Sequence, residues 1–203
     1  FKEIGLSDVP FELPTIRSWD LASTKPHAGN KDPDYTRGIK AKYNKDSGEF
    51  YILGMESTRN TPAMVQALIE NTATTDGRDC YISIPVDAGQ AGVVVADQKK
   101  ARLTSLGFKV VLDKQRTGKL ARAEPFLIAL QEGKVYVVRG VFSKADYEEL
   151  ECFDGKKNAG KHDDILDSIA SAFNILRSNS LIPTIRINRE KLLKMNLGGR
   201  TLL

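Results

Sequence analysis

Five aspartates stand where a folded chain could gather them into one acidic site. Asp20 ends the short apolar run IRSWD, and Asp87 ends the similar run CYISIPVD. The segment KHDDILDS adds Asp163, Asp164 and Asp167 near the start of a predicted helix. Residues three or four apart share a helix face, so Asp167 can point the same way as either of the other two.

Carboxylates gathered in this way indicate a site for a divalent cation. If the strands that end at Asp20 and Asp87 are neighbours, the two side chains face each other, and no lysine or arginine stands next to either in the sequence. Two uncompensated carboxylates repel each other, which favours protonation. Mg²⁺ or Mn²⁺ removes that penalty, because both ions prefer oxygen ligands and are often held by a few carboxylates plus water.

Each acid has a simpler interpretation when it is taken alone. Asp20 could be a turn residue at the end of a strand, Asp87 could cap the helix that follows, and Asp163 could be an ordinary N-cap. The joint pattern favours a site, because two strand-terminal acids and an acid-rich helix start occur on one α/β frame.

The elements that must position these acids follow from the apolar patterning and the turn residues. Strands are predicted over 16–22, 37–44, 49–56, 80–87, 108–114 and 134–140. Helices are predicted over 61–73, 91–107, 120–133, 143–153 and 162–179. A hairpin followed by strand–helix alternation predicts an α/β fold whose mixed sheet is antiparallel in its first strands and parallel afterwards.

Composition is consistent with one sizeable domain and a tail. The chain has 203 residues, 41% of them apolar, and no run near the roughly 18 apolar residues that span a membrane, so a soluble protein that is not secreted is expected. The net charge of +4 resides in 179–203, which we interpret as a basic C-terminal tail after a domain at 1–178. Cys80 and Cys152 lie far apart and outside any C-x-x-C pattern, so both are expected to be buried thiols.

Clusters of basic residues suggest contacts with nucleic-acid phosphates, although each could also be a solvated face. Seven residues are candidates for DNA binding, four in KQRTGKLAR and three in DGKKNAGK: Lys114, Arg116, Lys119, Arg122, Lys156, Lys157 and Lys161. The TGK in the first cluster is not a Walker motif, because the first glycine of that motif would fall at Asp113.

The motifs taken together resemble the nuclease domain of the large terminase subunit, the DNA-packaging protein of tailed bacteriophages. That domain belongs to the RNase H-like, or RuvC-like, nucleases. The matching segments are WDLA, IPVDAGQAG, TGKLARAEPFLIALQEGKVYV and KHDDILDSIASAF, which occur in the expected order over roughly residues 16 to 178.

The resemblance implies an RNase H-like fold, with helices on both faces of the sheet, and an endonuclease that cleaves concatemeric double-stranded viral DNA by two-metal phosphodiester hydrolysis. It implies that two Mg²⁺ or Mn²⁺ ions are held by Asp20, Asp87, Asp163 and Asp164. Asp167 matches the further acid that resolvase-like relatives carry. The family often has glutamate where Asp87 stands.

The resemblance also implies partners. Terminase large subunits join a nuclease to an ATPase domain, which this chain lacks, and work with a portal protein and a small subunit in the cytoplasm of the infected bacterium. Residues 179–203 could dock to the portal or to the motor, or could only aid solubility. Two other functions remain open: a RuvC-like junction resolvase, and a catalytically silent module that binds DNA or docks to the motor.

Overall fold

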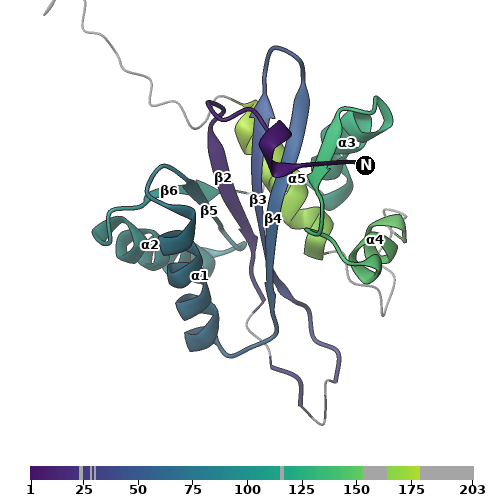
Figure 1. The fold of residues 1–203 in the computed structure, drawn as a ribbon. Coiled ribbons are helices and arrows are strands. Elements are labelled where there is room, and N and C mark those ends of the chain that lie inside the picture. Colours follow the sequence, from purple (N-terminus) through teal and green to yellow (C-terminus); the bar gives the residue numbers. More distant parts are fainter. Residues whose placement is uncertain (23–24, 28, 30, 115–116, 153–163, 179–203) are drawn as a thin grey trace, which may run out of the picture.

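The computed structural model describes residues 1–22, 25–27, 29, 31–114, 117–152 and 164–178. In this part of the chain, one sheet has helices on both faces (Figure 1). The strands are β1 (Lys2–Ile4), β2 (Thr15–Asp20), β3 (Thr36–Asn44), β4 (Glu49–Thr58), β5 (Tyr81–Pro85), β6 (Lys109–Asp113) and β7 (Val135–Val138). The helices are η1 (Leu6–Asp8, a 3-10 turn), α1 (Pro62–Asp76), α2 (Gln90–Ser105), α3 (Lys119–Gln131), α4 (Lys144–Glu151) and α5 (Asp164–Arg177).

The sheet is mixed, as the sequence predicts. Its strand order is β1-β7-β4-β3-β2-β5-β6, in which β2, β3 and β4 are antiparallel neighbours and every other pair is parallel. The prediction missed β1, a three-residue edge strand without an apolar run. Every predicted strand and helix is present, with boundaries shifted by a few residues.

The hairpin of β3 and β4 forms the long antiparallel part of the sheet. Its turn closes through the amide of Gly48, which donates to the carbonyl of Asn44 at 2.8 Å. Gly48 has a φ of 75°, in the left-handed region that favours glycine. A register shift between Lys40 and Ala41 marks an irregularity in the pairing of the two strands.

Two apolar clusters fill the two faces of the sheet. One lies under α3 and α5 and includes Phe50, Phe126 and Phe173; the other lies under α1 and α2 and includes Trp19. The ring of Trp19 packs against Gly38, where an added Cβ would come within 2.6 Å of it. Because side chains alternate along a strand, the burial of Trp19 under α1 and α2 directs Asp20 toward the α5 face.

Two further sequence predictions have different outcomes. Cys80 is buried as expected, but Cys152 is exposed, so its prediction as a buried thiol is wrong. Cys152 follows the last turn of α4, a short helix without a fully buried residue, and so its side chain stays at the surface. No helix in the described ranges is long and apolar enough to cross a bilayer.

Candidate active site

Asp20 is the last residue of β2 and lies partly buried on the α5 face of the sheet. Burial raises the pKa of its carboxyl to about 7, and the negative charges of Asp167 and Asp164 contribute to the same shift. Lys119 and Arg122 act in the opposite direction and are outweighed. The end of β2 is therefore a place where negative charge accumulates at a real energetic cost.

Helix α5 carries two of the acids to this place. Its apolar residues lie against β2, β3 and α3, which buries the helix almost completely. Asp164 is 6% exposed, and its Oδ2 accepts a 2.7 Å hydrogen bond from the backbone amide of Tyr35. The first turn of α5 is thereby attached to the chain segment that enters β3.

Asp167, one turn further along α5, is 9% exposed and paired with two cations of α3. Lys119 Nζ lies 2.6 Å from its Oδ2, and Arg122 Nη2 lies 2.6 Å from its Oδ1. The expectation of uncompensated acids, based on neighbours in the sequence, is therefore incomplete. The fold supplies positive charge from α3, a segment remote in the sequence from both β2 and α5.

Strand β2, which ends at Asp20, and strand β5, which ends two residues before Asp87, are parallel neighbours, as the hypothesis of a shared site requires. Ser18 lies directly across from Ser83, so Asp87 extends further past the paired residues than Asp20 does. Asp87 is exposed, and the charges that contribute most to the raised pKa of Asp20 are those of Asp167 and Asp164. The structure therefore places Asp87 at the same edge of the sheet as Asp20, in the turn that follows β5.

The turn after β5 has its own packing requirement. The N-cap of α2 is Gly89, not Asp87, so the simple capping interpretation of Asp87 is wrong. An added Cβ at Gly92 would come within 2.4 Å of the carbonyl oxygen of Asp87. Glycine at that position therefore lets α2 begin close against the backbone that carries the acid.

The donor set suits a hard divalent cation, although the carboxylates do not enclose one as they stand. Asp20, Asp164 and Asp167 offer only oxygen atoms, and their charges oppose one another across the end of β2. Over the described ranges, no group of three or more acid, histidine or cysteine side chains is close enough to hold a metal ion. Asp163, the remaining predicted ligand, lies outside these ranges.

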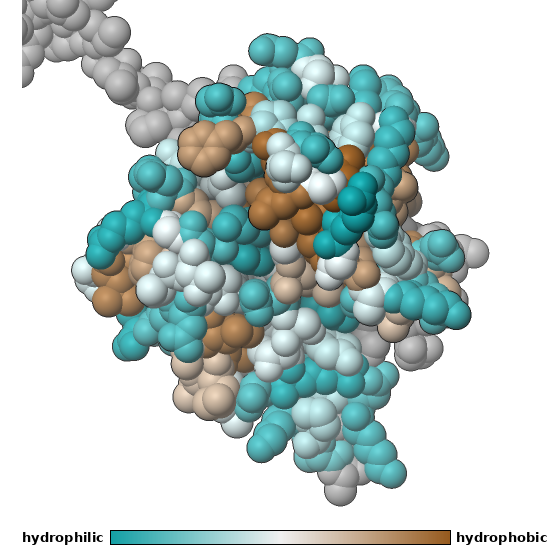
Figure 2. Space-filling model, viewed as in Figure 1, coloured by the Kyte–Doolittle hydropathy of each residue, from teal (hydrophilic) through white to brown (hydrophobic). Residues whose placement is uncertain are grey.

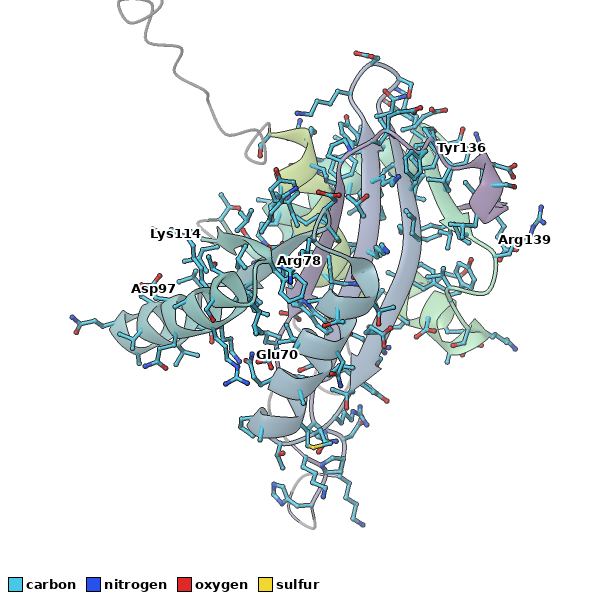
Figure 3. The ribbon with its side chains drawn as sticks, turned by 60° about the vertical axis from the view of Figure 1, so that its left-hand side comes forward. Glu70, Arg78, Asp97, Lys114, Tyr136 and Arg139 are labelled. Atoms are coloured by element: carbon cyan, nitrogen blue, oxygen red, sulfur yellow. The ribbon has the colours of Figure 1, made fainter. Side chains whose placement is uncertain are left out.

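The predicted DNA-binding residues fall into three groups. Lys119 and Arg122 contact Asp167 and so belong to the acidic site itself. Lys114 is exposed just beyond the end of β6, and Figure 3 shows it on the side of the molecule where α2 lies. The remaining four lie outside the described residues: Arg116, Lys156, Lys157 and Lys161.

Sequence reasoning missed a polar chain beneath the acids. Ser18 Oγ donates to Ser171 Oγ at 2.8 Å, and Ser171 Oγ donates to Asp113 Oδ2 at 2.7 Å. Asp113 ends the apolar strand β6, so it carries the same signal that singled out Asp20 and Asp87. That signal could have found Asp113, whereas nothing in the sequence marks the two serines.

The chain is similar to known proteins in sequence and in fold. A family model described as the terminase RNaseH-like domain matches residues 17–176. No curated protein matches the chain significantly.

Among solved structures, the P22 large terminase nuclease domain superposes with a TM-score of 0.65 at 14% identity, covering 91% of each chain. The human cytomegalovirus terminase nuclease domain, soaked in Mn, gives 0.50 at 13% identity, covering 79% of this chain and 81% of the other. The fowlpox virus Holliday junction resolvase gives 0.48 at 14% identity, covering 81% and 98%. At these identities, the first two similarities show a shared fold.

The matched segment begins within β2, ends within α5 and so contains Asp20, Asp87, Asp164 and Asp167. It covers well over half of the chain. The chain belongs to the family of terminase RNaseH-like domains.

Proposed function

We propose that this domain is a metal-dependent endonuclease that cleaves concatemeric double-stranded viral DNA during genome packaging. The observation that carries the proposal is the cost of ionising Asp20, whose pKa is raised to about 7 by burial and by the charges of Asp167 and Asp164. Lys119 and Arg122 compensate the charge of Asp167, but Asp20 remains costly to ionise, and a bound divalent cation would offset that cost.

The proposed ligands are Asp20 from β2, Asp87 from the turn after β5, and Asp163 and Asp164 from the start of α5, with Asp167 as a further acid. Two bound Mg²⁺ or Mn²⁺ ions would activate the attacking water and stabilise the leaving 3′ oxygen of the phosphodiester. The cytomegalovirus terminase nuclease domain was soaked in Mn, which supports this choice of metal by analogy.

The protein's own groups would orient these ligands. The amide of Tyr35 holds one oxygen of Asp164, so the other oxygen is oriented with respect to α5. Lys119 and Arg122 hold Asp167 in the same way, and their positive charge also makes the end of β2 less repulsive toward a DNA phosphate. Asp20 can accept a cation only after its carboxyl has lost its proton.

The surface around this end of the sheet is hydrophilic. Hydrophilic side chains cover the lower end of the molecule, where the chain between β2 and β3 lies (Figure 2). Phosphate contacts position DNA without reading its sequence. Little sequence preference is therefore expected, with Lys114 and the basic segment 156–161 as further proposed contacts.

Cleavage of supercoiled plasmid tests the proposal. The native domain should nick and linearise plasmid with Mn²⁺ or Mg²⁺ and should be inert with a chelator, whereas Asp20→Ala and Asp87→Ala should be inactive with any divalent ion. Asp79→Ala is the matched control, because Asp79 is a fully exposed acid before the opposite end of β5 and pairs with Lys109. Undiminished cleavage by Asp20→Ala would refute the assignment.

The same assay separates the other two functions. A strong preference for four-way junctions over plain duplex would indicate a resolvase. Salt-sensitive DNA binding without cleavage under any divalent ion would indicate a silent binding or docking module.

The remaining proposals concern the assembly. A terminase ATPase domain, a portal protein and a small subunit are the proposed partners, in the cytoplasm of an infected bacterium. Residues 179–203 are the proposed docking segment, and their deletion should impair packaging while cleavage by the isolated domain is unchanged.

A further inference from the structure

A buried chain of hydrogen bonds ties together three of the elements that surround the acids. Ser18 on β2 donates to Ser171 on α5, and Ser171 donates to the carboxylate of Asp113 at the end of β6, with heavy-atom distances of 2.8 and 2.7 Å. Ser18 is fully buried and Ser171 is 5% exposed. Both hydroxyl protons are used, and Asp113 is the acceptor on which the chain ends.

This chain lies directly beneath the acidic site. Ser18 and Asp20 are two residues apart on the same strand, so both side chains point to the α5 face. Ser171 follows Asp167 by four residues, so both lie on the same face of α5. The hydrogen bond between the two serines therefore joins the strand that carries Asp20 to the helix that carries Asp164 and Asp167.

Two other hydrogen bonds join α5 to the chain at β3, from Ser168 Oγ to the carbonyl of Arg37 and from the Tyr35 amide to Asp164, and the remaining contact with the sheet is largely apolar. Ile165, Ile169 and Phe173 pack into the cluster with Ile16 and Ile39, and such packing is not directional. Apolar surfaces allow small sliding or rotation at modest cost, whereas hydrogen bonds are directional. The buried bond between the two serines and the partly buried bond to Asp113 therefore favour one position of α5 along and around its axis. The hydrogen bonds of this chain therefore help to define the position of α5 on the sheet, which apolar packing alone leaves less restricted.

We propose that Asp113, Ser171 and Ser18 are positioning residues. They hold α5 against β2 at the position along the helix axis that brings the carboxylates of Asp164 and Asp167 near Asp20. The inference rests on the proposed function, since it concerns how well the same acids bind a cation. None of the three needs to touch the metal or the DNA. They act through the spacing of the acids.

The variants follow from the direction of the hydrogen bonds. Ser171→Ala removes both bonds, and Asp113→Leu removes the terminal acceptor and leaves the Ser171 hydroxyl buried without it. Asp113→Asn keeps an oxygen that can accept from Ser171, so it is the conservative variant that should restore function.

The chain offers a matched serine control. Ser83 lies directly across from Ser18 on β5 and is also fully buried, yet its hydroxyl has no hydrogen-bond partner within the described part of the structure. Ser83→Ala therefore removes the same atom at the same depth without breaking the chain. Asp76→Asn is a second control, because it disturbs a buried acid on the opposite face, where Asp76 pairs with Arg17 and Lys40.

Calorimetric titration with MnCl₂ alone, on the whole domain, gives the first measurement. Ser171→Ala and Asp113→Leu should weaken Mn²⁺ binding by about 10-fold to 100-fold, the scale found for partners that orient metal ligands. Asp113→Asn, Ser83→Ala and Asp76→Asn should bind within about threefold of the native domain. Native affinity in Ser171→Ala and Asp113→Leu, even with a lowered melting temperature, would show a purely structural role and overturn the proposal.

Amide hydrogen exchange on the metal-free domain gives the second measurement. Ser171→Ala should speed exchange in α5 around Asp167, and Ser83→Ala should not; equal rates in α5 would also overturn the proposal. If the native domain neither binds Mn²⁺ nor cleaves DNA, the proposed function fails, and the exchange rates still decide whether the hydrogen-bonded chain holds α5.

Discussion

Asp20 at the end of β2 and Asp167 on α5 lie close enough that the charge of Asp167 raises the pKa of the Asp20 carboxyl. Burial is the larger cause, and Asp164 adds to it. The relationship joins two segments from opposite ends of the matched domain. In the metal-free domain, the carboxyl of Asp20 is therefore partly protonated at neutral pH.

Metal binding should therefore depend on pH around neutrality. A carboxyl with a pKa of about 7 is protonated below that pH and cannot serve as a ligand, so Mn²⁺ affinity at low metal concentration should rise as the pH passes through about 7 and level off above it. Titrations between about pH 5.5 and about pH 8.5 measure this dependence. An affinity that stays constant over this range would contradict the raised pKa.

Asp20→Asn should stabilise the metal-free domain while abolishing cleavage. Because the folded-state pKa of Asp20 is raised above its ordinary value of 3.8, the stability associated with its protonated form is lost as the pH rises through about 7. Asparagine carries no charge, so the variant should gain on the order of a few kcal/mol in unfolding free energy at about pH 8 and clearly less at about pH 5, because the loss in the native domain develops between the ordinary pKa of 3.8 and about 7.

Urea unfolding of the native domain and of Asp20→Asn at the two pH values checks this prediction. Saturating Mn²⁺ should stabilise the native domain and leave Asp20→Asn nearly unchanged. A variant less stable than the native domain at about pH 8 would show that Asp20 contributes contacts rather than repulsion.

Asp87→Ala should separate function from stability. Asp87 is exposed, so its loss should change the unfolding free energy by no more than about 0.5 kcal/mol. If Asp87 holds a metal, cleavage should fall by about 100-fold or more, and Asp87→Glu should keep most of the activity because the longer side chain retains the carboxylate. Plasmid cleavage and thermal unfolding of both variants check this, and native activity in Asp87→Ala would remove Asp87 from the site.

Arg122→Met should shift the pH dependence of metal binding upward. The Arg122 charge lowers the pKa of Asp20, so removing it should move the half-maximal Mn²⁺ affinity to higher pH. It should also cost roughly 1–3 kcal/mol in stability, because buried Asp167 loses one of its two cations.

Lys114→Met is the control for that shift, since Lys114 is exposed just beyond the end of β6 and Arg122 is among the largest contributors to the pKa of Asp20. It should weaken DNA binding and flatten its salt dependence while the pH dependence stays native. Identical pH curves for Arg122→Met and the native domain would contradict the role given to α3.

Most of the fold could be predicted from the sequence, because its signals are local. The buried strands are short apolar runs, the hairpin has a turn-rich segment between β3 and β4, and Ser143 caps α4 by accepting from the amide of Asp146. The edge strand β1 was missed because three residues paired at a sheet edge need no apolar pattern.

The candidate site was only partly predictable, because its decisive contacts join segments far apart in the sequence. Lys119 and Arg122 were expected to face DNA as a basic cluster, and the pairing of both with Asp167 depends on how α3 packs on α5. Asp113 carried a local signal at the end of β6, whereas Ser18 and Ser171 acquire their significance only when β2 and α5 are brought together.

Manganese anomalous scattering from a crystal of this domain soaked in MnCl₂ tests the central claim most directly. The account predicts anomalous peaks bound to the carboxylate of Asp20 and to an aspartate at the start of α5, with Asp87 reaching the same cluster. Absence of a peak at Asp20 in a soaked crystal, or peaks bound only by acids elsewhere on the surface, would contradict the account.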